Sequence, residues 1–306
     1  MKSNNPILPN LIIAGVTKAG TTSLFMYLKQ HPEICASTVK ETCYFLPVRY
    51  GTPLAPLNVY LDFFAECGNT RYVMEATPGY FYGGTRVARG ILDLLGEVHV
   101  IIVLREPIGR MISFYKYLKS RMMLPRKMTF EEYIKKCEST PNNKREGMDG
   151  DLYWGIDGGF YDLYLQDWVE IFGNKLKVVF FDELMTSPSD CTKGICSWLN
   201  LDGNIYDGIK LQVENRSVSY QNQLLQKWAI EINDRSEQFW RRFPKLKQTL
   251  RNWYYQINGE EFELNISPSI YQYLGQKFKP HNQRLALNLK SLGYLNLPKW
   301  LEDTGE

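Results

Sequence analysis

The sequence predicts an α/β protein with a P-loop-like, three-layer fold, in which helices flank a central parallel sheet of about five strands and a helical part follows. Short apolar runs, of which Val98–Leu104 is the clearest, alternate with segments whose apolar residues recur at helical spacing. A glycine-containing turn, Gly15–Gly20, joins the first run to the first helical segment, and beyond about residue 215 only helical patterns remain. Strands alternating with helices form βαβ units, whose strands are parallel and whose crossovers are right-handed.

The individual elements can be placed in chain order. Strands are expected at 11–15, 34–36, 71–75, 98–104 and 177–181, and helices at 23–31, 57–67, 86–95, 107–119, 160–172 and 188–199. Gly96 closes one helix as a C-terminal cap, and Pro107 starts another where proline is tolerated. Residues 139–158 are polar and rich in glycine and charge, which predicts a surface loop.

The length of the chain bounds its domain organisation. With 306 residues it can bury one large core, and it contains no internal repeat or charge block. We therefore expect a single domain over 1–306, with an α/β core at 1–214 and a helical region at 215–306 that closes the acceptor side.

Composition and charge restrict the partners. Hydrophobic residues make up 44% of the chain and charged residues 23%, and the formal net charge is +3. So small a charge gives no bulk attraction to nucleic acid polymers or membranes, although it is compatible with a local anion site. No run approaches the ~18 apolar residues that span a bilayer, and the N-terminus lacks an apolar secretory core. We expect a cytoplasmic protein that acts on a small molecule.

Cysteine and histidine give little sign of metal binding. The six cysteines form no C-x-x-C pair and have no zinc-ligand spacing, so we expect reduced, buried thiols. The only histidines are His31, His99 and His281, too few for a histidine-rich metal centre.

The first turn has the layout of an anion-binding loop. A buried strand, a turn with glycines and threonines, and a helix together point backbone N–H groups and a helix N-terminus at a phosphate-like group. Gly15 and Gly20 match the Walker A pattern, but Thr21 stands where that pattern has its lysine, and the lysine of this chain is Lys18. The alternative for this stretch alone is an ordinary strand-to-helix turn.

A nucleoside triphosphatase would also need a magnesium ligand on a neighbouring strand. The apolar run 178–181 ends in Asp182 and Glu183 and resembles such a strand. The commoner case is a strand whose exit carries solvated acids. A P-loop small-molecule kinase or NTPase that uses Asp182 for magnesium is therefore the alternative to the function inferred below.

A second anion site is expected after the strand 98–104. Arg105 follows that strand directly, and Ser113 lies on the next helix, so a guanidinium and a hydroxyl could hold one phosphate group. Isolated arginines more often form solvated salt bridges. Two separate anion sites suit a ligand with anionic groups at both ends of a nucleoside.

The motifs resemble those of sulfotransferases that use 3′-phosphoadenylyl sulfate (PAPS). Residues 18–24 resemble the loop that binds the 5′-phosphosulfate, and Arg105, Pro107, Arg110 and Ser113 are similar to the 3′-phosphate element R-x-P-x-x-R-x-x-S. Three further matches are Lys40-Glu41 with Tyr44-Phe45 to K-E-x-x-[FY]-F of the heparan-sulfate branch, 75–81 to its E-K-[ST]-P-x-Y-F, and Lys279–Asn282 with Arg284-Leu285 to a C-terminal helix start. In this order the motifs cover most of the chain.

Some positions depart from the family pattern. Thr17 stands in place of a common proline, and Ala76 replaces a lysine. The basic, glycine-containing loop that clamps the 3′-phosphate has no clear counterpart, and Arg216 and Tyr220 are weak substitutes for it. The printed residues contain no run like the transmembrane anchor of Golgi members, which favours the expectation of a soluble cytoplasmic enzyme.

The resemblance implies PAPS as donor, bound without a metal by Arg105, Ser113, Arg216, Tyr220 and the loop residues Lys18, Ala19, Gly20, Thr21, Thr22 and Ser23. Lys18, aided by Lys40, would stabilise the leaving phosphate. The expected reaction is sulfation of a hydroxyl or amine on a small polar acceptor, in natural-product or glycan tailoring. A nucleotide-binding module without catalysis is a third possibility.

Glu41 is the expected general base. It follows a strand on the cleft side, has Lys40 beside it, and occupies the position of the base in the heparan-sulfate branch. The three histidines are expected elsewhere, at a helix end, within a strand and on a distant C-terminal helix. The alternative is a structural Lys40–Glu41 pair on the surface of a loop.

Overall fold

A computed structural model describes residues 7–140, 148–209, 211, 219–236, 244–260 and 264–302. Its contacts group the chain into two compact units. The first consists of Met1–Arg110, Asp157–Asn215 and Leu274–Glu306, and the second of Met111–Ile156 and Arg216–Tyr273. The division at 214/215 expected from the sequence remains a prediction, and the two units are described separately.

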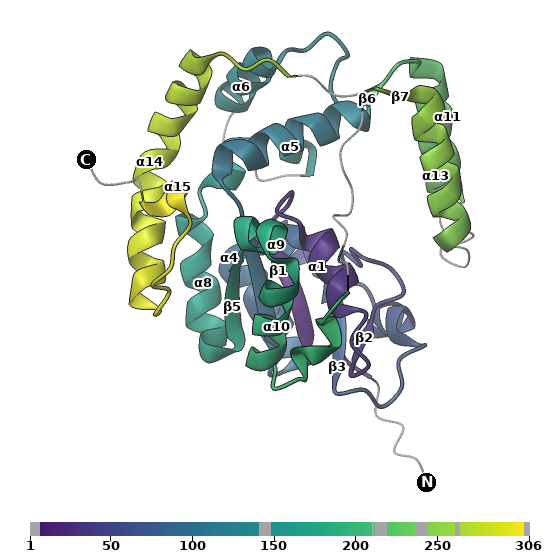
Figure 1. Cartoon of the computed structure of the whole chain (residues 1–306), viewed down its shortest axis with the longest axis vertical. Helices are drawn as coiled ribbons and strands as arrows, with labels where there is room; N and C mark the ends of the chain where they lie inside the picture. The colour runs from purple at the N-terminus through teal and green to yellow at the C-terminus, as the bar shows by residue number, and fades with distance from the viewer. Residues whose placement is uncertain are drawn as a thin grey trace. The chain divides into compact units, whose positions relative to one another are not determined.

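The first unit is built on a five-stranded parallel sheet, as predicted (Figure 1). Its strands are β1 (Leu11–Gly15), β2 (Ile34–Ala36), β3 (Tyr72–Ala76), β4 (His99–Leu104) and β5 (Leu176–Phe180), in the order β2-β3-β1-β4-β5. The register pairs Ile13 with Ala76 on one side and with Ile101 on the other. Since all strands are parallel, their carboxyl ends share one edge of the sheet.

Helices flank this sheet. They are α1 (Thr21–Leu28), α2 (Leu46–Arg49), α3 (Leu57–Leu61), α4 (Gly84–Leu95), the start of α5 (Pro107–Ser120), α8 (Asp162–Phe172), α9 (Phe181–Thr186), α10 (Pro188–Trp198), α14 (Pro268–Ser291, in this unit from Leu274) and α15 (Lys299–Glu302). Short 3-10 turns are η1 (Asp62–Phe64), η2 (Pro78–Gly83), η4 (Asp157–Gly159), η5 (Gly173–Lys175) and η6 (Gly203–Tyr206). Helix α4 packs on α8, and α1 on α10.

The core lies around the two central strands. Every residue of β1 is buried, and so is β4 from Val100 to Leu104. Continuous apolar runs are expected for parallel strands with both faces covered, which is why these two strands are the clearest in the sequence. The rigid centre of the sheet thus supports the loops that follow β1 and β4.

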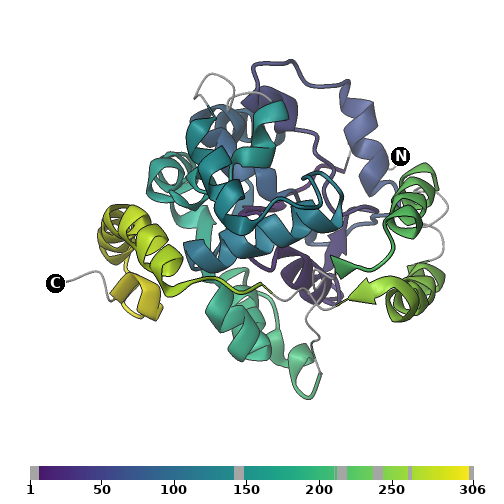
Figure 2. The same cartoon turned by 90° about the horizontal axis from the view of Figure 1, so that it is seen from above.

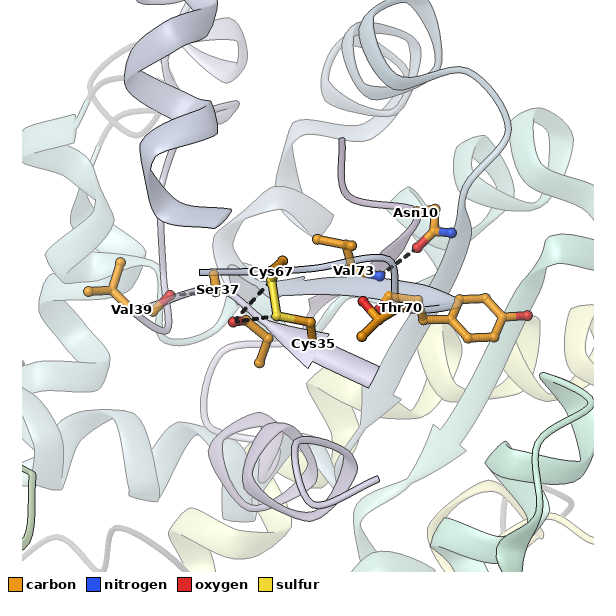
Figure 3. Close-up of a disulfide and its surroundings, with 9 residues drawn as sticks. Asn10, Cys35, Ser37, Val39, Cys67, Thr70 and Val73 are labelled. Carbon is orange, nitrogen blue, oxygen red and sulfur yellow. Dashed lines mark hydrogen bonds between the residues drawn. A yellow bond between two sulfur atoms is a disulfide. The ribbon is translucent and has the colours of Figure 1, made fainter. Parts of the chain in front are cut away.

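One cysteine prediction is wrong. Cys35, in β2, forms a disulfide with Cys67 just beyond η1, with a Cα–Cα distance of 5.7 Å (Figure 3). The two residues are 32 positions apart and were not recognisable as a pair from spacing, because the folding of the intervening chain brings them together. The remaining thiols are buried at Cys137, Cys191 and Cys196, but Cys43 is exposed.

The second unit is mainly helical (Figure 2). It contains most of α5, α6 (Phe130–Ser139), η3 (Met148–Tyr153), α11 (Gln223–Arg235) and α13 (Pro244–Asn258), and the strands β6 (Ser219–Tyr220) and β7 (Gly259–Glu260) pair antiparallel. Thr129 and Glu132 form a capping box at the start of α6. The predicted surface loop 139–158 includes η3 and η4, and its residues 141–147 lie outside the described residues. No helix in the described part of the chain is long and apolar enough to cross a membrane.

Candidate active site

Three of the predicted site residues lie on loops at the carboxyl edge of the sheet. Lys18 follows β1, Glu41 follows β2 and Arg105 follows β4, all within the first unit. Ser113 lies on α5 and Tyr220 on β6, in parts of the second unit, and both side chains are partly exposed. Arg216 lies outside the described residues.

The loop after β1 is fixed by the sheet below it. The Val16 amide donates to the carbonyl of Val103 in β4 (2.9 Å), and the Ala19 amide donates back to the carbonyl of Val16 (3.2 Å). The close packing requires both glycines. A Cβ on Gly15 would lie 2.6 Å from the Phe81 Cβ, and Gly20 has a φ of 82°, a left-handed conformation that favours glycine.

Helix α1 begins at Thr21, two residues earlier than the sequence indicated. Its first N–H groups have no partner within the helix, and its dipole favours an anion at this end. Ala19, Thr21 and Ser23 are buried, whereas Gly20 and Thr22 are partly exposed. The start of α1 and the loop before it therefore have the chemistry needed to hold a phosphate group.

Lys18 is the cation of this loop. Its φ of 71° is left-handed, which is uncommon for a residue with a side chain. The pKa of Lys18 is lowered to about 8, mainly by burial; the negative charge of Glu41 opposes this shift, and the positive charges of Arg105 and Lys40 add to it. These electrostatic contributions mean that the four charged groups lie near one another. Because burial and the neighbouring cations disfavour the charged form of Lys18, a bound anion would stabilise its ammonium group strongly.

Arg105 packs directly against the same loop. Its NH1 group donates to the carbonyl of Lys18 (3.0 Å), and its guanidinium carbon lies 4.1 Å from the centre of the Phe181 ring. Burial lowers the pKa of Arg105. Its own carbonyl accepts a hydrogen bond from the Tyr161 hydroxyl (2.7 Å). The guanidinium is thus held in place on one side while its other N–H groups can bind a ligand.

Acidic residues flank this arginine. The Glu106 carboxylate accepts the amides of Ile108 (2.8 Å) and Gly109 (2.5 Å), and so caps the start of α5. Asp182 lies exposed in the first turn of α9, and its negative charge acts on Arg105. The strand exit that could have carried a magnesium ligand therefore has a guanidinium beside it.

Glu41 lies on an unusual loop between β2 and α2. Its φ is 68°, its amide donates to the carbonyl of Ala76 at the end of β3 (2.8 Å), and its side chain is 54% exposed. Lys40 Nζ lies 2.6 Å from Glu41 Oε1. The carboxylate is thus paired with a lysine and open to solvent, a geometry that fits both an accessible base and the surface ion pair considered as its alternative.

The three histidines are occupied elsewhere in the first unit. His281 Nδ1 lies 2.7 Å from Asp162 Oδ1, and its ring stacks on Phe160 at 3.8 Å. His31 Nε2 lies 3.0 Å from the Asp202 carbonyl, and His99 packs edge-on against Trp198. Across the described residues, no group of three or more His, Cys, Asp or Glu side chains could hold a metal ion.

These features define a class: an α/β protein with a glycine-containing loop between its first strand and first helix, and several charged groups at the carboxyl edge of its sheet. No family model matches the chain. It is 30% identical over 207 residues to human heparan sulfate glucosamine 3-O-sulfotransferase 3B1, which covers 67% of this chain and 49% of that protein. It is 23% identical over 304 residues to bifunctional heparan sulfate N-deacetylase/N-sulfotransferase 1 of Xenopus laevis, covering 96% of this chain and 31% of that protein.

The fold agrees with the sequence similarity. The crystal structure of a sulfotransferase from Alicyclobacillus acidocaldarius matches with a TM-score of 0.67 at 20% identity, over 96% of this chain and 99% of that chain. The sequence similarity makes this chain a homologue of the heparan sulfate sulfotransferases, and the structural match shows the sulfotransferase fold. It spans about half or less of the length of the curated relatives named above.

Sequence reasoning missed part of the site. Phe181 under Arg105, and Tyr60 beside the buried Glu75, are aromatic residues in apolar surroundings that gave no signal of their own. Glu75 was visible only as part of a motif. Its neighbours come from three separate segments, and only the folded chain brings them together.

Proposed function

We propose that this protein is a PAPS-dependent sulfotransferase that moves a sulfuryl group to a hydroxyl or amine of a small polar acceptor, in natural-product or glycan tailoring. The observation that carries the proposal is the grouping of charges beside the loop after β1: Arg105 NH1 donates to the Lys18 carbonyl (3.0 Å), Lys40 Nζ lies 2.6 Å from Glu41 Oε1, and the charges of Arg105, Lys40 and Glu41 act on Lys18. Cations for the donor and a carboxylate for the acceptor are thus gathered at one edge of the sheet. Homology to the heparan sulfate sulfotransferases supports the same reaction class.

The donor would lie on the loop after β1 and the start of α1. PAPS supplies an activated sulfuryl group whose departure leaves negative charge on a phosphate oxygen. Lys18 would stabilise that charge, since a preorganised cation in a partly dry site acts most strongly where charge develops. By analogy with phosphoryl transfer, positioning and electrostatics would carry most of the catalysis, in an in-line transfer. Lys40 would assist.

Glu41 would serve the acceptor as general base. An acceptor hydroxyl loses its proton as it attacks sulfur, so a proton acceptor within hydrogen-bond reach is needed. Glu41 is exposed, and its charge acts on Lys18, so one carboxylate could face the acceptor beside the donor loop.

The 3′-phosphate would be held by Arg105, whose guanidinium is fixed through NH1 and Phe181. Ser113 is assigned to this phosphate from the motif R-x-P-x-x-R-x-x-S alone, and Arg216 and Tyr220 only as weak substitutes for the basic loop of the family. No metal is needed in this scheme, because a sulfuryl group carries less charge than a terminal phosphoryl group and Lys18 can take the role that magnesium has in NTPases.

The proposal is tested by incubating the purified protein with PAPS labelled in the sulfuryl group and a panel of alcohols and amines. We expect labelled product with at least one acceptor and formation of 3′-phosphoadenosine 5′-phosphate (PAP). Absence of transfer to every acceptor, together with absence of PAP binding in calorimetry, would refute it. PAP binding without any transfer would favour the nucleotide-binding module.

A further inference from the structure

The loop that carries Glu41 is tied to the end of β3 and η2 by successive hydrogen bonds. The Glu41 amide donates to the Ala76 carbonyl (2.8 Å) and the Thr42 hydroxyl to Glu75 Oε2 (2.5 Å). Further along, the Cys43 amide donates to the Thr77 hydroxyl (3.3 Å), and the Phe45 amide to the Tyr80 hydroxyl (3.2 Å). Four of the five residues from 41 to 45 are therefore anchored to one segment.

Glu75 is the centre of this anchor. It is completely buried, and its two carboxyl oxygens have different tasks. Oε1 accepts the Tyr60 hydroxyl (2.5 Å), whereas Oε2 accepts the Thr42 hydroxyl (2.5 Å) and lies 3.3 Å from the Tyr80 hydroxyl and 3.4 Å from that of Thr77. Burial raises the pKa of Glu75, and these hydrogen bonds oppose the shift. A carboxyl group is costly to bury unless it is hydrogen-bonded. Each of these hydrogen bonds therefore offsets part of the cost of placing Glu75 in the core.

The loop needs such an anchor. Glu41 and Cys43 both have left-handed backbones, with φ values of 68° and 56°, which cost free energy in residues that carry a Cβ. Such conformations persist only where the surroundings determine them. The Glu41 side chain, in contrast, is 54% exposed, so little packing fixes it directly.

We infer that Glu75 is a positioning residue that sets the Glu41 loop through Thr42, and so places the proposed base. This inference rests on the proposed function. Glu75 does not reach the acceptor itself, since it is fully buried. Its loop-facing oxygen fixes the residue next to the base, while its other oxygen is held by Tyr60.

The geometry offers a matched pair of variants. Thr42→Val removes the hydroxyl that links the loop to Glu75, and Thr42→Ser retains it. Tyr60→Phe removes a hydrogen bond of equal length to the same carboxyl, but leaves the Thr42–Oε2 hydrogen bond in place and keeps the ring that stacks on Tyr44 and packs edge-on against Phe45. Each variant is compared for kcat, KM of the acceptor, PAP affinity and thermal unfolding.

We expect Thr42→Val to lower kcat by about 10- to 100-fold, since small displacements of a reacting group cost this much. PAP affinity should stay within about twofold, Thr42→Ser should restore most of kcat, and Tyr60→Phe should lower the melting temperature with a much smaller effect on kcat. An unchanged kcat in Thr42→Val, or equal losses in Thr42→Val and Tyr60→Phe, would overturn the inference.

Hydrogen–deuterium exchange separates this inference from the proposed function. The amides of Glu41, Cys43 and Phe45 donate into the anchor, so their exchange should speed up in Thr42→Val but not in Tyr60→Phe, with no change at 16–24. If the wild type transfers nothing from PAPS, the proposed function fails, while faster exchange at 41–45 still supports the anchor. If exchange at 41–45 is the same in Thr42→Val and wild type, the anchor is refuted whatever the activity.

Discussion

The loops after β1 and β2 each hold a charged residue in a strained backbone conformation, but different contacts fix them. Both conformations are left-handed, with a φ of 71° at Lys18 and of 68° at Glu41. The Lys18 loop lies over the centre of the sheet, where Gly15 and Gly20 allow close packing and backbone groups of β4 fix it. The Glu41 loop lies beyond the edge strand β2 and, apart from the Ala76 carbonyl, is fixed by the side chains of Glu75, Thr77 and Tyr80.

The difference matches the two tasks that we assign to the loops. The donor nucleotide is the same for every acceptor, so the cation that binds it can be partly buried in a fixed loop. Lys18 is held in this way, and its pKa is lowered to about 8, mainly by burial. An acceptor must approach the base from solvent, and the Glu41 side chain is accordingly 54% exposed, paired with Lys40, while its backbone amide is held by the Ala76 carbonyl. Variants of the two loops should therefore separate donor binding from acceptor chemistry.

The largest effect should come from the acceptor loop. Glu41→Gln keeps size and hydrogen bonding but removes the basic oxygen, so turnover should fall by about 10²- to 10⁴-fold. PAP affinity, measured by calorimetry, should stay nearly unchanged. Retention of more than about a tenth of wild-type turnover, against the expected loss of at least ~10²-fold, would show that Glu41 is not the base.

Lys18→Ala should come next, on the donor loop. Turnover should fall by about 10²- to 10³-fold, the usual loss when one contact to a developing charge is removed. PAP binding should weaken by much less, because most of the contribution of Lys18 is expected in the transition state. Single-turnover rates measure the loss of turnover, and calorimetry measures the loss of PAP affinity. Equal losses in both would mean that Lys18 contributes to donor binding and not to catalysis.

Arg105→Ala and Ser113→Ala should act on one end of the donor only. Each substitution should weaken the binding of PAP by about 10- to 100-fold, since a hydrogen bond to a charged group contributes roughly 1.5–3 kcal/mol. Adenosine 5′-phosphosulfate lacks the 3′-phosphate and should bind almost as it does to wild type. Similar weakening of both ligands would show that the 3′-phosphate is bound elsewhere.

The lowered pKa of Lys18 predicts a smaller, pH-dependent effect. Below about pH 8 the ammonium is charged and attracts the donor; above it the charge is lost, so PAP affinity of the free protein should decrease by up to about tenfold by pH 9. Lys18→Arg should abolish this alkaline decrease, because a guanidinium stays charged throughout that range. A decrease that persists in Lys18→Arg would assign it to another group.

Much of the donor side could be predicted from the sequence. Parallel strands with both faces covered are continuous apolar runs, so β1, β4 and the loops after them were recognisable, and the predicted five-stranded parallel sheet is confirmed. The placement of Lys18, Glu41 and Arg105 past strand ends followed from the same pattern. Their roles remain proposals.

The rest depends on contacts between distant segments. Glu75 meets Thr42 and Tyr60 across 33 and 15 positions, and Cys35 meets Cys67 across 32. No local spacing in the sequence predicts such pairs, and the sequence alone does not distinguish a buried glutamate from an exposed one. Asp182, expected at a strand exit, proved to be in the first turn of α9, because β5 ends at Phe180.

We propose that the loop after β1 binds an adenylyl sulfate donor through Lys18 and without magnesium. The most direct measurement is thermal unfolding in EDTA with PAP or ATP, repeated with magnesium, for wild type and Asp182→Asn. We predict that PAP raises the melting temperature equally with and without magnesium, that ATP gives no larger shift when the metal is added, and that Asp182→Asn behaves as wild type. If only ATP with magnesium raised the melting temperature, and if Asp182→Asn abolished that rise, the proposed donor site would be refuted and a kinase or NTPase site identified.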